Sequence, residues 1–173
     1  RLDSDARRVL RAASVFGEIL WEGGVMALLG SGVDADVVRS LLGALVHQDV
    51  LVRRLVSHLG TEPELAFRSP LVREGAYATL TDDDRALGHR LAGEWLEGAG
   101  ERDPVVLAEH FERGLDPARA GAFHLRAAEE ALQAGDGARA ARAAERGLAC
   151  AGLPDDTRAA LLAIGGSSTG ERV

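Results

Sequence analysis

Signals that start α-helices recur at short intervals along this 173-residue chain. Ser69-Pro70, Asp103-Pro104 and Asp116-Pro117 each join a capping side chain to a proline that fits the first helical turn. Thr81 precedes three aspartates at 82–84, which stabilise a helix N-terminus because the helix dipole attracts negative charge there. The second half of the chain is therefore expected to be almost wholly helical. The predicted helices cover 81–100, 104–113, 117–134, 137–151 and 155–164.

The first 80 residues carry a different pattern. Ser4 is predicted to cap a first helix, and a short second helix follows around 24–29. Asp34 is predicted to cap a third helix, whose apolar residues repeat at helical spacing. The β-branched run VLVRRLVS then reaches a turn at 59–63, and ELAFRS returns as a second strand. Three helices and a hairpin form the element order of a winged helix, so we predict a winged-helix domain over residues 1–80.

Small residues dominate the segment 117–152, where two helices must approach closely around a tight turn. This pattern is similar to a tetratricopeptide (TPR) repeat of about 34 residues, with Phe123 as its only large aromatic. The predicted fold class is thus mainly α, with a winged helix followed by antiparallel TPR-like helices over 81–164. A Gly/Ser-rich flexible tail is expected over 165–173. Because the helix at 155–164 would begin a repeat that is not completed, its apolar face would be uncovered, and we expect self-association or loose packing at this end.

The charged residues exclude several functions. All 20 basic residues are arginine, and a Walker A phosphate loop needs a lysine, so this loop is absent. The net charge is −7, which disfavours nucleic acid as a partner because binding to phosphate backbones requires a basic surface. The sequence lacks the long uncharged apolar run that would predict a membrane span. We expect a cytoplasmic protein. The chain starts without Met, as an internal segment of a longer protein would.

No constellation of catalytic residues is present, and we predict no enzyme activity, cofactor or metal for this chain. The serines lack the G-x-S-x-G pattern of hydrolases. The histidines are dispersed and form no H-E-x-x-H motif. These histidines are His47, His58, His89, His110 and His124. Cys150, the single cysteine, lies among alanines and is expected to be a small buried residue.

One motif is more specific than the others. Residues 67–77 read FRSPLVREGAY, and RALGHRLA follows in the next predicted helix. The pattern resembles the region just after the nucleotide-binding core of large bacterial signalling ATPases of the STAND type. Some members of that family are fused to Ser/Thr kinases, nucleotide cyclases or LuxR-type DNA-binding domains. The resemblance implies a regulatory segment whose winged helix packs on the core and whose helical repeats receive a protein partner.

The resemblance also assigns candidate site residues. Arg68, Ser69 and Arg73 are the candidates for contact with the nucleotide-binding core. In the family a histidine that contacts bound ADP often occupies the position of Ser69. A serine cannot supply an imidazole, so this chain departs from the family pattern at the nucleotide-contacting position.

The residues themselves indicate a second set of candidates, for partner binding. Trp21 lies between two predicted helices and is expected to be partly exposed, and Phe123, Arg53 and Arg54 complete the set. Two other functions stay open. One is a winged-helix transcriptional regulator that binds DNA, and the other is a pure TPR-like scaffolding module.

Overall fold

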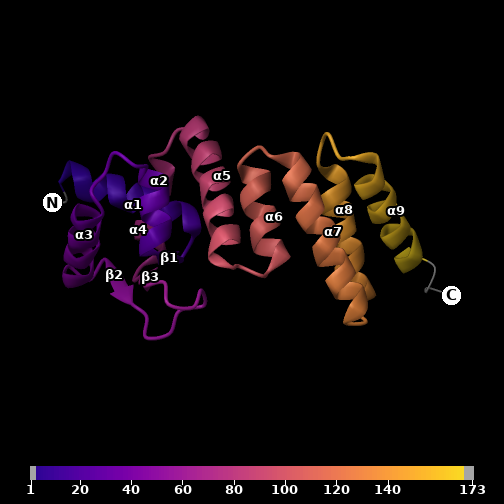
Figure 1. The fold of residues 1–173 in the computed structure, drawn as a ribbon, viewed down its shortest axis with the longest axis horizontal. Helices are drawn as coiled ribbons and strands as arrows, with labels where there is room; N and C mark the ends of the chain where they lie inside the picture. Colours follow the sequence, from indigo (N-terminus) through magenta and orange to yellow (C-terminus); the bar gives the residue numbers. More distant parts are fainter. Residues whose placement is uncertain (1–2, 170–173) are drawn as a thin grey trace. The chain divides into compact units, whose positions relative to one another are not determined.

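The computed structural model describes residues 3–169 and is mainly helical (Figure 1), which confirms the predicted fold class at this level. The chain divides after Gly100 into two compact units. Within the described residues, none of the helices combines the length and the apolar character that are needed to cross a bilayer.

The first unit contains five helices and three short strands among its described residues. In chain order these are α1 (Ser4–Phe16), β1 (Ile19–Trp21), α2 (Glu22–Leu29), α3 (Ala35–His47), β2 (Leu51–Arg53), β3 (Glu64–Phe67), α4 (Pro70–Ala78) and α5 (Asp82–Ala99). Asp3, rather than Ser4, caps α1, since its carboxylate accepts a hydrogen bond from the amide of Ala6. Asp34 and Thr81 cap α3 and α5 as predicted.

The strands form one antiparallel sheet in the order β1-β3-β2. Leu65 of β3 pairs with Leu20 of β1 and with Arg53 of β2. The predicted hairpin corresponds to β2 and β3, whereas β1 was not predicted. Its three residues are too few to display the alternation of apolar and polar side chains that identifies a strand.

The core of the first unit gathers apolar side chains from α1, α2, α3 and the sheet. Its buried members are Val9, Leu10, Ala13, Leu20, Val25, Val38, Leu42, Leu45, Leu51, Leu65 and Phe67. Helix α5 also belongs to this unit, because the Trp95 ring lies 5.9 Å from Phe16 and 6.1 Å from Trp21 between ring centroids. Our predicted boundary after residue 80 therefore falls too early, since these aromatic contacts join α5 to α1 and β1.

The second unit is a series of helices in which α6 packs on α7, α7 on α8, and α9 on both α7 and α8. The helices are α6 (Pro104–Arg113), α7 (Pro117–Gln133), α8 (Gly137–Ala149) and α9 (Asp155–Thr169). Gly147 of α8 permits a close approach, because a Cβ there would lie 2.9 Å from Leu161 and 3.1 Å from His124. Small residues at such positions explain the dense packing of this unit.

Helix α9 continues beyond its predicted end at residue 164 and reaches Thr169. The predicted flexible tail is therefore wrong for residues 165–169, while 170–173 lie outside the described residues. Glycine and serine lower helix propensity by only about 0.5–1 kcal/mol each, so they weaken a helix without ending it.

The turn between α6 and α7 places Leu115 in the left-handed region, with φ of 56°. The amide of Asp116 donates to the Phe111 carbonyl at 2.9 Å, which closes the helix end around this residue. Because glycine adopts this conformation without steric cost, Leu115→Gly should raise the free energy of unfolding by about 0.5–1 kcal/mol. Urea denaturation measures the change. Leu115→Ala keeps the Cβ and is the matched control, so an equal gain from alanine would contradict this explanation.

Candidate functional site

The arginines of the hairpin are engaged by carboxylates of the same unit. Arg53 lies 2.9 Å from the Oε1 of Glu22, and the Nε of Arg54 lies 2.7 Å from the Oε1 of Glu64. Both guanidinium groups remain about half-exposed while their partners are buried. The pair of Arg54 therefore anchors the loop that joins β2 to β3, residues 54–63, and the pair of Arg53 joins β2 to α2.

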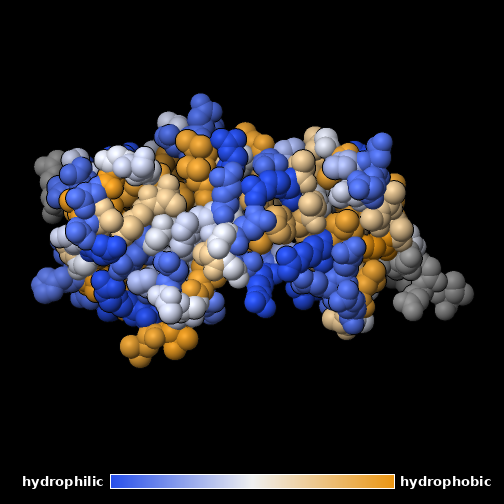
Figure 2. All heavy atoms as spheres, in the orientation of Figure 1, coloured by the Kyte–Doolittle hydropathy of each residue, from blue (hydrophilic) through white to orange (hydrophobic). Residues whose placement is uncertain are grey.

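Glu64 organises this loop. Its side chain is 0% exposed, and it accepts hydrogen bonds from the His58 amide at 2.8 Å and from the His58 Nδ1 at 2.9 Å. Burial opposes ionisation of Glu64, but the hydrogen bonds from His58 and the charges of His58 and Arg54 outweigh it and lower the pKa of this carboxyl. The loop tip that these bonds support carries Leu55 and Val56, both exposed. Figure 2 shows an apolar patch projecting where Figure 1 places this loop.

Trp21 does not lie on an accessible surface, contrary to our prediction. It is 7% exposed, and its ring meets the Phe16 ring edge-on at 6.1 Å. Pairing of β1 with β3 directs this side chain into the interior, where Trp95 covers it. Its indole Nε1 is buried without a hydrogen-bond partner among residues 3–169.

The three candidates for contact with a nucleotide-binding core lie at the start of α4. Arg68 pairs with Asp49 at 3.1 Å and stays largely exposed, and Arg73 lies 3.9 Å from Glu74. Ser69 occupies the N-cap position, but its hydroxyl makes no capping hydrogen bond within the described part of the chain. The structure brings these residues to one helix end.

A mainly apolar groove of about 560 Å³ runs from this helix end along α4 to Thr79, between α1 and α4. Leu71 and Val72 of α4 line it together with Leu10 of α1. Leu71 is 76% exposed. It lies close in sequence to Arg68 and Ser69, two of the residues predicted to contact a nucleotide-binding core. This groove was not predicted, because the apolar pattern of α4 does not reveal which of its residues stay uncovered.

Phe123 contributes to the interior of the second unit. It is half-buried and stacks on Phe111 with ring centroids 5.6 Å apart and planes 8° apart. One part of its surface remains accessible, so the predicted role in partner binding stays a prediction. On the last helix, Leu162 is more than half-exposed, and the predicted self-association through this end also stays a prediction.

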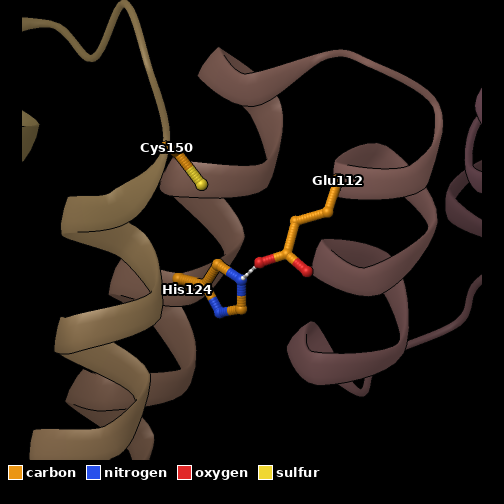
Figure 3. A group of neighbouring side chains, drawn as sticks. All are labelled: Glu112, His124 and Cys150. Atoms are coloured by element: carbon orange, nitrogen blue, oxygen red, sulfur yellow. Dashed lines mark hydrogen bonds and ion pairs between the residues drawn. The ribbon is translucent and has the colours of Figure 1, made fainter.

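Three side chains that were not predicted to act together converge in the second unit. Glu112 comes from α6, His124 from α7, and Cys150 follows the last residue of α8. One carboxylate oxygen, one imidazole nitrogen and the sulfur all lie within 4.8 Å of one another. Figure 3 shows the three side chains pointing toward one another. The Nε2 of His124 lies 2.5 Å from the Oε1 of Glu112.

Arg146 completes the electrostatics of this cluster. Its guanidinium contacts the Oε2 of Glu112 at 2.8 Å and the Oε1 of Glu109 at 3.3 Å. Burial opposes ionisation of Glu112, but the hydrogen bonds and charges of His124 and Arg146 outweigh it and lower the pKa of this carboxyl. Burial, followed by the negative charge of Glu112, raises the pKa of the Cys150 thiol.

This arrangement is poorly suited to a cysteine nucleophile. An activated cysteine needs a lowered pKa and a base that takes its proton. Here the pKa of the Cys150 thiol is raised, and its sulfur contacts the Arg146 carbonyl oxygen at 3.5 Å. The Nε2 of His124 already bonds to Glu112. The other ring nitrogen, Nδ1, lies on the edge of the imidazole that is turned away from the sulfur (Figure 3).

Sequence reasoning missed the cluster because its members lie far apart along the chain. Cys150 is 26 residues beyond His124, and no short-range ligand motif connects them. The available signal was weak: Glu112 and His124 lie near the turn between two predicted antiparallel helices, which brings such positions together.

No known family model matches the chain, and no curated protein or solved structure is similar enough to count as a match.

Proposed function

We propose that this chain is a non-catalytic regulatory segment of a large bacterial signalling ATPase in the cytoplasm. In this proposal a winged-helix domain contacts a nucleotide-binding core, and TPR-like helices receive a protein partner. The element order α1-β1-α2-α3-β2-β3, with an antiparallel sheet ordered β1-β3-β2, supports the winged-helix assignment. The sequential packing of α6 to α9 supports the repeat-like assignment, since helical repeats contact mainly their neighbours.

The exposed Leu71 carries the proposal. A large apolar side chain that is 76% exposed on a short helix, above an apolar groove, is typical of a surface that another domain covers. It lies within the FRSPLVREGAY motif, beside Arg68 and Ser69. The apolar surface and the motif that resembles the family's core-contacting region thus coincide.

The structure offers less support to the DNA-binding alternative. Arg39 of α3 pairs with Asp36 at 2.5 Å, and the hairpin arginines pair with Glu22 and Glu64. A recognition helix requires basic or amide side chains that are free to meet base edges and phosphates. Binding to a phosphate backbone would have to compete with these ion pairs.

The proposed mechanism is an equilibrium between two packing states. In one state the surface formed by Arg68, Ser69, Leu71 and Val72, here called the α4 surface, covers the nucleotide-binding core, which retains its nucleotide. In the other state the α4 surface is released from the core. A partner bound to α6–α9 shifts this equilibrium only by the difference in its affinity for the two states. No reactive group of this chain is required.

A substitution at Leu71 in the full-length protein tests the proposal. Burying a leucine contributes about 1.5–3 kcal/mol, so Leu71→Asp should speed ADP release about 10- to 100-fold, measured with a fluorescent nucleotide. In the isolated chain the same change should alter the free energy of unfolding by less than about 0.5 kcal/mol, because the side chain is exposed.

Val37→Asp is the matched control for this test. Val37 is also an exposed apolar residue, but it lies on α3 and outside the α4 surface. It should leave ADP release unchanged. Equal nucleotide release from the two variants and the parent, or a full-length protein without a nucleotide-binding core, would refute the proposed function.

A further inference from the structure

We propose that Glu112, His124 and Cys150 form a binding site for a thiophilic divalent cation, with Zn²⁺ as the best fit. The site goes beyond the proposed regulatory function and does not depend on it. Each residue supplies one ligand atom, and the three atoms already lie within 4.8 Å of one another. They come from α6, α7 and the end of α8, so one cation would join three helices of the second unit.

The distances suit a tetrahedral ion after small side-chain movements. Zinc lies about 2.3 Å from sulfur and about 2.0–2.2 Å from nitrogen or oxygen, which places ligand atoms roughly 3.3–3.6 Å apart. The contact between the His124 Nε2 and the Glu112 Oε1 must therefore open from 2.5 Å, and the sulfur must move toward them. All three side chains point into the same space (Figure 3).

The donor set selects the class of cation. One thiolate, one imidazole and one carboxylate suit Zn²⁺ and Co²⁺, whereas Mg²⁺ and Ca²⁺ require several oxygen ligands. A water molecule would occupy the fourth position, as in zinc sites with three protein ligands. Access from solvent is open, because Glu112 and Cys150 are only partly buried, while His124 is buried.

The charges around the site balance a bound cation. On binding, the Cys150 thiol releases its proton to solvent. The proton between His124 and Glu112 leaves the Nε2 for solvent, and the neutral imidazole, protonated on Nδ1, binds the metal through the Nε2. The thiolate, Glu112 and Glu109 then carry three negative charges against one positive charge of Arg146, so a divalent ion brings the group to neutrality. Arg146 contacts the Oε2 of Glu112, which leaves the Oε1 directed at His124 and available to the metal. It also orients the carboxylate, as residues that contact metal ligands commonly do.

Cobalt provides the direct test, because a bond between Co²⁺ and a thiolate produces charge-transfer absorption in the near ultraviolet. The purified full chain is titrated with Co²⁺ and then with Zn²⁺ as competitor. We expect one Co²⁺ per chain, the charge-transfer band, its loss when Zn²⁺ is added, and an upward shift of the melting temperature with Zn²⁺. Cys150→Ser should abolish the band and weaken Zn²⁺ binding at least about 10-fold.

Two further variants separate this site from adventitious binding and from misfolding. His58→Gln changes a histidine that pairs with a different carboxylate, Glu64, outside the cluster of three ligand atoms. It should leave the band and the stoichiometry unchanged. Glu112→Gln keeps the side-chain volume and should weaken Zn²⁺ binding while far-ultraviolet circular dichroism stays native. Absence of the band in the folded parent chain, or an undiminished band in folded Cys150→Ser, would overturn the proposal.

Discussion

Phe111→Ala should lower the free energy of unfolding of the second unit by about 3–5 kcal/mol. Phe111 is 0% exposed, and its ring stacks on Phe123 at 5.6 Å between centroids. The guanidinium of Arg119 lies 3.9 Å from the centroid of the same ring. Alanine would leave a cavity at the contact between α6 and α7 and would remove both ring interactions. Urea denaturation followed by circular dichroism measures the loss.

Phe123→Ala is the comparison that makes this prediction specific. Phe123 is the other ring of the same stack, but it is only half-buried. Its removal should cost about 1–2 kcal/mol, because less apolar surface returns to water. If the two substitutions cost the same, the stacking interaction rather than the burial of Phe111 would dominate, and our reason for the larger effect would be wrong.

Glu64→Gln should lower the free energy of unfolding by about 2–4 kcal/mol near pH 7. The parent carboxylate is fully buried and is bonded to the His58 amide, the His58 ring and Arg54. Glutamine keeps the shape of the side chain but loses the charge that these donors stabilise, and the loop at 54–63 loses its anchor. The change is measured by chemical denaturation of the parent and the variant under identical conditions.

The pH dependence of this difference has a defined sign. Because the pKa of Glu64 is lowered in the folded state, its contribution to stability is fully present above the unfolded pKa of about 4.3. It is lost as the pH falls through the lowered folded pKa. The gap between the parent and Glu64→Gln should therefore close progressively as the pH falls below about 4. A gap that widens in acid would contradict the assignment.

Asp36→Asn serves as the control for an exposed ion pair. Asp36 pairs with Arg39 three residues later on α3, and both side chains are mostly exposed. Such pairs contribute about 0–1 kcal/mol, so this variant should stay close to the parent across the same pH range. A loss as large as that of Glu64→Gln would show that net charge, rather than the buried contacts of Glu64, determines the effect.

Much of the secondary structure could be predicted, because helix starts are encoded locally. Asp103 and Asp116 accept hydrogen bonds from amides two and three residues ahead, as their position before proline predicted. Strand β1 and the continuation of α9 could not be predicted in this way. The first depends on pairing with β3, and the second depends on weak propensities that give no clear stop.

The candidate site residues, in contrast, could not be predicted from local sequence. Trp21 was predicted to be partly exposed from its place between two helices. Its side chain is instead buried by contacts with β3 and Trp95, which are both distant in sequence. Cys150 was predicted to be an inert core residue, yet the packing of α6, α7 and α8 brings it to Glu112 and His124. Neither the burial of Trp21 nor the position of Cys150 beside Glu112 and His124 is indicated by the residues next to it in the sequence.

The sequence by itself determined where most helices lie, the caps at Asp34, Thr81, Asp103 and Asp116, and the absence of a Walker A lysine, because these depend on residue type and short spacing. Only the tertiary structure decided which residues meet: the groove at Leu71, the buried Glu64 that holds the hairpin loop, and the convergence on Cys150. The physical reason is that helix formation is governed by neighbours a few residues apart, whereas a surface or a ligand set is created when distant helices pack together.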